Sequence, residues 1–584
     1  MKTQTDGHGI AGVVRGRTPR QEGYAILLVL FFSGVALLAL AGVMDWTKTN
    51  GTLIYRDNQY YRSSGAAEAA TEKVLTRMAR DYKNQGEATV YSSIGTYSDL
   101  VPTTAESPAW GDFAFSDALG HNNRTYIGRT ATTAYVPLAS QYSGLFGFAS
   151  TYRVISNVRE SSSRFAFSSA VQQDVQLASI PIFQFAIFYS GDMELNGAAT
   201  LNVRGRVHGN SHLYTGSTAN QTFFSDVTVS GIVSNGARYG WTLGGTVTYS
   251  GQKDTNVGTL SLPIGTNNTP GAVREVLYTP PAGEDLASAM ARERYYNKAN
   301  LILLVSNSTV TVGLKNPYDA TYTSVPWLAC TNFVSTNKSF TDQREGKTIA
   351  TTEIDVAKFT TWATTNSSVI AKFGAGNIPN LIYAADFRTE TGSKIDGIRL
   401  VNGQTLPTSG LTVATPNPLY TLGHYNQPNA GYLGTTNTSN TKPASLVSDA
   451  YTLLSSSFTD GASSASYTTR NPGDTTVVAA VVTGNVPSAG TYSGGVNNLP
   501  RLLENWTGHT FTLNGSLVCL YNSAKATAPF QNPGVYYSAP TRNINFDPNF
   551  YDPARLPPGT PTLRTLVRSK WSTPPPGSTT YAAY

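Results

Sequence analysis

Four side chains of metal-binding type lie in one polar stretch, and they are the first residues whose types could do chemistry. Asp192 and Glu194 are followed by His208 and His212. On a β-strand, residues four apart are separated by about 13 Å, because each residue advances the chain by about 3.3 Å. A zinc ion holds its ligands at about 2 Å, so the two histidines cannot reach one ion from one strand. The sequence therefore predicts solvated histidines in turns and no metal site.

Carboxylate pairs are the other arrangement that could carry a reaction. Asp192 with Glu194, or Asp386 with Asp396, would suit glycoside hydrolysis if the fold held the pair about 5 to 10 Å apart in a groove. The chain lacks the HExxH, GxSxG and P-loop patterns of common hydrolases and nucleotide-binding proteins. We therefore expect no enzymatic activity and no cofactor. An exported carbohydrate-active enzyme is the alternative.

The chain has 2 cysteines, Cys330 and Cys519. In an oxidising compartment a disulfide between them would close a long loop and remove about 4 to 5 kcal/mol of unfolded-chain entropy. The alternative is two buried thiols in separate β elements, where they behave as small apolar side chains. Their spacing does not choose between these alternatives.

An uncharged run extends from Tyr24 to Met44. As a helix rising ~1.5 Å per residue, it is long enough to cross the hydrocarbon core of a membrane, which is about 30 Å thick. A cleavable secretory signal has a shorter apolar region of about 7 to 15 residues. A membrane span is therefore favoured. Ala39-Leu40-Ala41 before Gly42 fits signal peptidase, so cleavage there is the alternative.

Charges on the two sides of this run predict its orientation. Arg15, Arg17 and Arg20 precede it, and Asp45 closes it. Positive charge is retained on the cytoplasmic side of a membrane span. We expect a single-pass protein with a cytoplasmic N-terminus and an exported remainder.

A second helical pattern follows the span in the stretch QYYRSSGAAEAATEKVLTRMARDYKN. Ala67, Ala70, Val74 and Met78 fall on one stripe, and charged residues fall on the opposite face. The pattern predicts one nearly continuous helix over residues 24–84, apolar all round and then amphipathic. Asn50-Gly51 is the expected weak point, because glycine costs about 1 kcal/mol relative to alanine inside a helix.

These residues resemble the N-terminus of a pilin. Glu22-Gly23 followed by Tyr24 looks like a prepilin peptidase site, and the stretch from Tyr61 to Leu75 is similar to the Ala-Ala-Glu-Ala signature of PilX-type minor pilins of type IV pili. The resemblance implies cleavage after Gly23 and methylation of Tyr24. It implies a bacterial cytoplasmic membrane, prepilin peptidase and other pilin or pseudopilin subunits as partners.

One position departs from the major pilins. The fifth residue after the implied cleavage is Leu28, where most major pilins carry a glutamate that pairs with a neighbouring subunit. A lone carboxylate in lipid costs several kcal/mol unless it is paired. K-type minor pseudopilins of type II secretion also lack this glutamate and sit at the filament tip. The resemblance therefore implies a minor or tip subunit.

The exported part reads as β-rich. Charged residues make up 13% of the chain, whereas Gly (53), Pro (31) and Tyr (33) are abundant. No dense run of lysine and arginine follows the leader, so no nucleic-acid partner is expected. Val203, Gly205 and Val207 recur in the same order as Val229, Gly231 and Val233, which favours short rungs of a parallel β-solenoid. An antiparallel meander is the alternative.

The predicted fold class is mostly β with a long N-terminal α-helix, membrane-spanning in its first half, and a short irregular parallel β-solenoid-like head with helical insertions. The C-terminal half also resembles an uncharacterised bacterial group without assigned chemistry, in stretches such as LPRLLENWTGHTFTLNGSLVCLYNS. The predicted segments are a leader (1–23), the helix (24–84), a β-rich pilin-like head (85–180), a solenoid-like segment (181–270), an α/β insertion (271–400), a resumed β-rich segment (401–555) and a Pro-rich tail (556–584).

The sequence thus predicts a minor pilin-like or pseudopilin-like subunit of a type IV pilus or type II secretion filament. Its large head would lie in the periplasm or outside the cell, at a tip, in priming or in adhesion. Exposed Tyr, Trp, Asn and Thr would suit a surface carbohydrate, because rings stack on sugars and amides form hydrogen bonds with them. The alternative is an unassembled, membrane-anchored exported protein that binds or degrades carbohydrate.

Overall fold

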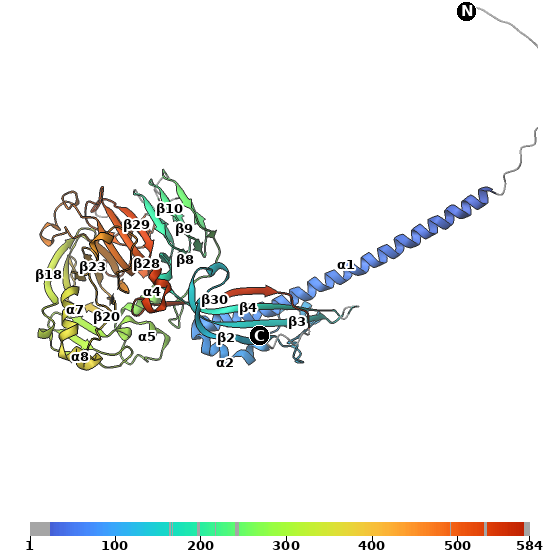
Figure 1. Ribbon diagram of the computed structural model, residues 1–584, viewed down its shortest axis with the longest axis horizontal. Coiled ribbons are helices and arrows are strands. Elements are labelled where there is room, and N and C mark those ends of the chain that lie inside the picture. The colour runs from blue at the N-terminus through green and yellow to red at the C-terminus, as the bar shows by residue number, and fades with distance from the viewer. Residues whose placement is uncertain are drawn as a thin grey trace, which may run out of the picture.

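A single long helix precedes a large β-rich body. The computed structural model describes residues 24–162, 165, 167–195, 199–216, 218–236, 238–239, 244–490, 492–530 and 534–576. Helix α1 (Tyr24–Gln85) has 62 residues. Its first half projects as a free rod, and its second half lies against a sheet (Figure 1). Two short helices follow, α2 (Glu87–Ser92) and α3 (Ile94–Ser98).

The sheet under α1, here called the stem sheet, is antiparallel. Its strands are β1 (Phe113–Ser116), β2 (Tyr126–Pro137), β3 (Phe146–Glu160), β4 (Ser168–Pro181) and β30 (Thr562–Ser572). Strands β1 and β2 pair with different parts of β3, β3 pairs with β4, and β4 pairs with β30. The last strand of the chain therefore completes a sheet that begins near its start.

Everything between β4 and β30 is an insertion, here called the inserted head (residues 182–561). The two ends of the head meet, because the backbone N–H of Ile182 donates to the carbonyl of Pro561 at 3.0 Å. Next to that bond, Pro181 pairs with Thr562 across the two strands. The head thus leaves the stem sheet and returns to it at one point.

This arrangement corrects the Pro-rich tail expected over residues 556–584, because Thr562–Ser572 form strand β30. The prolines flank this segment and do not interrupt it. Between them Leu563, Thr565 and Val567 are buried and alternate with less buried residues, which is the pattern of a strand with one covered face.

The first part of the head consists of short parallel strands stacked in columns. The three columns are β7-β10-β13, β5-β8-β11-β14 and β6-β9-β12. Val203 pairs with Phe223 and Val207 with Val227, so the repeat that aligned Val203 with Val229 had the wrong register. The strands are β5 (Ile187–Tyr189), β6 (Met193–Leu195), β7 (Leu201–Arg204), β8 (Val207–Gly209), β9 (Leu213–Thr215), β10 (Gln221–Phe223), β11 (Val227–Val229), β12 (Val233–Ser234), β13 (Val247–Tyr249) and β14 (Lys253–Asp254).

A helical segment then leads to the opposite end of the head, where antiparallel strands form the edge. The elements are α4 (Pro270–Arg274), α5 (Ala289–Glu293), α6 (Tyr295–Lys298), β15 (Leu301–Val305), β16 (Val310–Leu314), β17 (Thr323–Val325), β18 (Val334–Asp342), β19 (Lys347–Asp355), α7 (Val356–Thr365) and α8 (Ser367–Phe373). Strands β16, β17 and β18 pair antiparallel with their neighbours.

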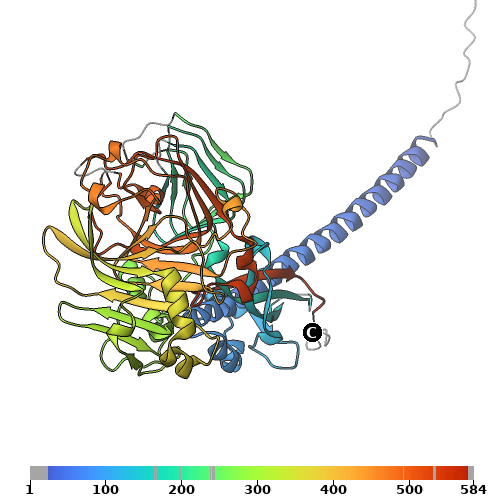
Figure 2. The same cartoon turned by 60° about the vertical axis from the view of Figure 1, so that its left-hand side comes forward.

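From there the chain winds back toward the first coils, and successive turns add parallel strands to two facing sheets (Figure 2). One sheet receives β20 (Leu381–Asp386), β22 (Leu411–Ala414), β24 (Ala444–Ser448), β26 (Thr475–Asn485), β28 (Thr510–Asn522) and β29 (Thr541–Phe546). The other receives β21 (Lys394–Val401), β23 (Pro418–Leu422), β25 (Ala450–Leu454) and β27 (Arg501–Leu502) after β19. Strand β29 pairs with both β28 and β7, so the two parts share one 16-stranded sheet.

The large sheet is buried on both faces. On β20, Ile382 and Ala384 join the core between the two facing sheets. Leu381, Tyr383 and Ala385 join a second core, which the helical segment and the end of the stem sheet cover. The structure confirms the predicted fold class: a long N-terminal helix followed by a mostly β head with helical insertions.

Candidate functional site

The residues expected to be processed lie at the very start of the described chain. Glu22 and Gly23 fall outside the described residues. Tyr24 is the first residue of α1, and 71% of its surface is exposed. The structure therefore presents Tyr24 at the free end of the rod, far from the head (Figure 1).

The first half of α1 makes almost no contact with the rest of the protein. Leu28 is 52% exposed and Met44 is 65% exposed, although both are apolar. Among the described residues, α1 alone is long and apolar enough to cross a membrane. The helix continues through Asn50 and Gly51 without interruption. An exposed apolar surface of this size calls for lipid or other helices as its partner.

The second half of α1 is the part that packs. Val74, Leu75, Met78 and Tyr82 form one core with residues of β2, β3 and β4. The apolar stripe predicted from the sequence is thus the face that meets the stem sheet. A neighbouring core lies nearer the membrane half, where small side chains bring the helix close to the sheet; its helix residues are Ala66, Ala67 and Ala70.

Polar side chains tie the helix to the last strand of the chain. Arg568 on β30 binds Glu72 on α1 with both of its terminal nitrogens, one at 2.6 Å. Gln173 on β4 donates to Glu72 and to Thr71 at 2.8 and 2.9 Å. The Arg568 hydrogen bond lowers the pKa of Glu72. The sequence alone did not reveal this link, because nothing in the Pro-rich C-terminus indicates its partner.

His208, the first of the two histidines considered as metal ligands, lies in the protein interior. His208 is fully buried on β8 and packs against the rings of Phe185 and Phe188, so the prediction of a solvated histidine is wrong there. Its ring nitrogens bond Thr228 and Asn210 at 2.9 and 3.1 Å. Burial lowers the pKa of His208 to about 4. His208 is a neutral core residue.

The nearby acidic residues are also engaged locally. Asp192 accepts from Ser211 at 2.6 Å and pairs with Arg238. Glu194 is 3% exposed and accepts from Ser488 at 2.7 Å, and burial raises its pKa. Within the described ranges, no three histidine, cysteine or acidic side chains converge as metal ligands would.

The second carboxylate pair lies in the interior. Asp386 ends β20 and accepts from Thr352 at 2.7 Å and from Arg388. Asp396 lies on β21 and, like Asp386, is 0% exposed. Burial and the charge of Asp386 raise the pKa of Asp396 to about 6. The two groups are therefore close, but neither is open to a polymer substrate.

Both cysteines are buried free thiols, so the structure has no disulfide between Cys330 and Cys519. Burial raises the pKa of each thiol to about 12. Each lies in the core between the facing sheets, Cys519 on β28. The structure thus matches the alternative stated above, in which the two cysteines are buried thiols that behave as small apolar side chains.

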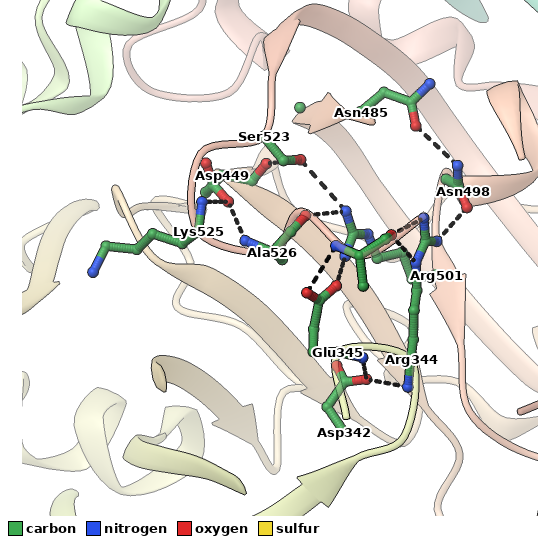
Figure 3. A network of polar contacts seen from close by, with 12 residues as sticks. Asp342, Arg344, Glu345, Asp449, Asn485, Asn498, Arg501, Ser523, Lys525 and Ala526 are labelled. Carbon is green, nitrogen blue, oxygen red and sulfur yellow. Dashed lines mark hydrogen bonds and ion pairs between the residues drawn. The ribbon is translucent and has the colours of Figure 1, made fainter. Parts of the chain in front are cut away.

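A buried network of hydrogen bonds and ion pairs, shown in Figure 3, connects distant segments of the inserted head. Arg501 on β27 pairs with Glu345 at 2.6 Å, and each side chain is 2% exposed. Asp449 accepts from the backbone N–H groups of Ala524, Lys525 and Ala526 at 2.5 to 3.0 Å. These bonds satisfy buried charges that would otherwise be costly, which gives the network a structural role. The sequence did not predict it, because its members come from distant segments.

Comparisons with known proteins complete the description. No protein-family model matches the chain, and no curated protein matches it. Among solved structures, the chain is similar to the competence-associated pilin ComZ from Thermus thermophilus, with 12% identity over 88% of this chain and 97% of that chain. The TM-score is 0.29, which is too low to place the two in one fold.

Proposed function

We propose that this chain is a minor pilin-like or pseudopilin-like structural subunit of a type IV pilus or type II secretion filament, without enzymatic activity. Helix α1 would anchor the precursor in the bacterial cytoplasmic membrane, with the N-terminus in the cytoplasm and the head outside. After cleavage by prepilin peptidase, the same helix would pack against the helices of other pilin or pseudopilin subunits. This one helix would therefore have two successive environments.

The observation that carries the proposal is the division of α1 into two halves. The first half is apolar and exposed from Tyr24 to Met44, and the second half is docked on an antiparallel sheet. A plain membrane anchor needs about 20 apolar residues and no rigid extension. A continuous helix fixed to a sheet holds the apolar half at a set angle to the head, as a subunit of a helical bundle requires.

Two features favour a tip or priming position. Leu28 stands where a body subunit would carry a pairing glutamate. The inserted head lies at the end of α1 opposite the N-terminus (Figure 1). In a filament whose helices point away from the membrane, a head in that position would occupy the place of the next subunits. The filament would then end at this chain, with the head displayed for adhesion.

The test is the N-terminus of the mature protein. Mass spectrometry of the chain from its native membrane should find N-methylated Tyr24. Exchange of Gly23 for a bulky residue should leave the leader attached and abolish recovery with sheared filaments. As a matched control, the same exchange at Gly34 should leave processing unchanged, because a Cβ atom added there would have no other atom within 4 Å.

An intact Met1 in the wild type, or a mature chain that begins at Gly42, would refute cleavage by prepilin peptidase. Normal N-methylation without incorporation into filaments would refute assembly alone. The competing function, an unassembled membrane-anchored protein that prepilin peptidase does not process, predicts the intact Met1.

A further inference from the structure

A cleft of about 970 Å³ lies where the inserted head meets the stem sheet. Its walls come from α5 and α6, from residues just before β15 and β20, and from the return segment that leads into β30. A volume of this size is typical of sites that enclose a small organic ligand. No residue expected from the sequence to carry function lines it.

Two guanidinium groups of this cleft lack a carboxylate partner. Arg292 on α5 donates its Nε to the carbonyl of Ala287 at 3.2 Å, and Arg564 on β30 lies near the ring of Tyr82. Within the described residues, neither arginine forms an ion pair, whereas Lys298 in the same cleft is paired with Glu293 at 2.7 Å. An arginine without a carboxylate partner offers a planar pair of donors to a carboxylate on a ligand.

The neutral lining groups suit hydroxyls. Asn300 and Asn380 line the cleft, and in the part of the chain that the structure describes their side-chain amides bond no protein group. An amide both donates and accepts, as a sugar hydroxyl does. The lining therefore combines charge for one acidic group with amides for several hydroxyls.

Tyr318 supplies an aromatic ring and an unusual backbone. Its φ is +67°, a conformation that bulky residues rarely adopt, and 42% of its surface is exposed. Its backbone N–H donates to Asn297 at 2.7 Å, and its hydroxyl donates to the carbonyl of Arg292 at 3.1 Å. Glycine would adopt this conformation without strain. Backbone strain beside a cleft points to function, because a glycine at position 318 would adopt this backbone conformation with less strain than tyrosine does.

We propose that this cleft binds an acidic saccharide through carboxylate contacts with Arg292 and Arg564 and a sugar ring on Tyr318. The saccharide is favoured over a nucleic acid because a nucleic-acid site needs several phosphate contacts, while the chain has a net charge of only +6 over 584 residues. This inference rests on the proposed display of the head outside the membrane.

The test uses the full chain in detergent micelles and isothermal titration with oligomers of galacturonate, glucuronate and guluronate. We expect at least one to bind, and its methyl ester, which keeps the rings and loses the charge, to bind at least tenfold more weakly. Arg292→Gln and Arg564→Gln should each weaken binding at least tenfold. Arg204→Gln, at the exposed last residue of β7 and outside the cleft, should leave the affinity unchanged.

Tyr318→Gly separates binding from folding. It removes the ring and relieves the backbone, so the thermal midpoint should stay equal or rise while affinity falls at least tenfold. The proposal is overturned if no uronate oligomer binds, if the methyl ester binds equally, if an oligothymidylate binds in its place, or if Tyr318→Gly keeps full affinity. None of these results bears on N-methylation of Tyr24, so the two proposals fail separately.

Discussion

At the scale of single residues, burial decides what the titratable groups do. His208 combines a ring of metal-binding type with a spacing that already excluded a shared ion, but its neutral state follows from the side chains around it. Alternation could not have indicated that His208 points inward, because all three residues of β8, Val207–Gly209, are buried. The sequence also could not show that Phe185 and Phe188 would cover His208, because these two rings come from another coil.

The buried His208 makes stability depend on pH. Its pKa in the folded protein is about 4, below the ordinary value of 6.5, so the unfolded chain binds the extra proton between these values. Stability is therefore fully present above pH 6.5 and falls as the pH drops toward 4. Between pH 7.5 and pH 5 the loss should be roughly 2 kcal/mol from this residue.

Urea unfolding followed by tryptophan fluorescence at both pH values would measure this loss. His208→Gln, which keeps a polar side chain for Thr228, should lower stability at pH 7.5 and reduce the difference between the two pH values by about that amount. His509→Gln, at a partly exposed site, is the control. An unchanged pH dependence in His208→Gln would contradict the assignment.

At the scale of elements, the sequence was most informative about α1. Its apolar run and its later stripe are both local patterns, so the helix could be predicted as residues 24–84 and is found as Tyr24–Gln85. Strand β30 could not be predicted in the same way. Its pairing partner β4 lies far away along the chain, and prolines on both sides of β30 mask its alternation.

The contact between α1 and the stem sheet gives a prediction at this scale. Val74→Asp would place an uncompensated charge in a core where Val74 is 0% exposed, and should cost about 3 to 5 kcal/mol. Limited proteolysis should then cut within residues 59–85. Thr76→Asp introduces the same residue on the exposed side of the helix and should leave the cleavage pattern unchanged. Equal protection of both variants would show that the packing is not what holds the helix.

At the scale of the whole molecule, the head is an insertion with adjacent ends. The contact of Ile182 with Pro561 and the pairing of Pro181 with Thr562 hold its two ends together where it leaves the stem sheet. Composition and turn-rich texture were enough to predict a β-rich head, whereas the repeat that suggested parallel coils had the wrong register. Neither feature could show that β29 pairs with β7, because that contact depends on two segments far apart in the chain.

Excision of residues 182–561 should therefore leave a foldable stem. Joining Pro181 to Thr562 through an Asn-Gly turn would convert β4 and β30 into a hairpin. We expect a helical and β signal in circular dichroism and normal N-methylation of Tyr24. The excised head, expressed alone, should keep its buried thiols unreactive until denatured. A stem that loses its β signal would show that the head is needed to fold the sheet.

The two-strand junction also has a mechanical consequence. The strands β4 and β30 are antiparallel neighbours that enter the head at the same end. A pull on the head therefore loads both strands along their length at once and in the same direction. The hydrogen bonds that hold β4 to β3 resist such a load together, in shear, and cannot open one after another like a zipper. A head attached in this way can carry tension from its surroundings into α1 without unravelling the sheet that joins them.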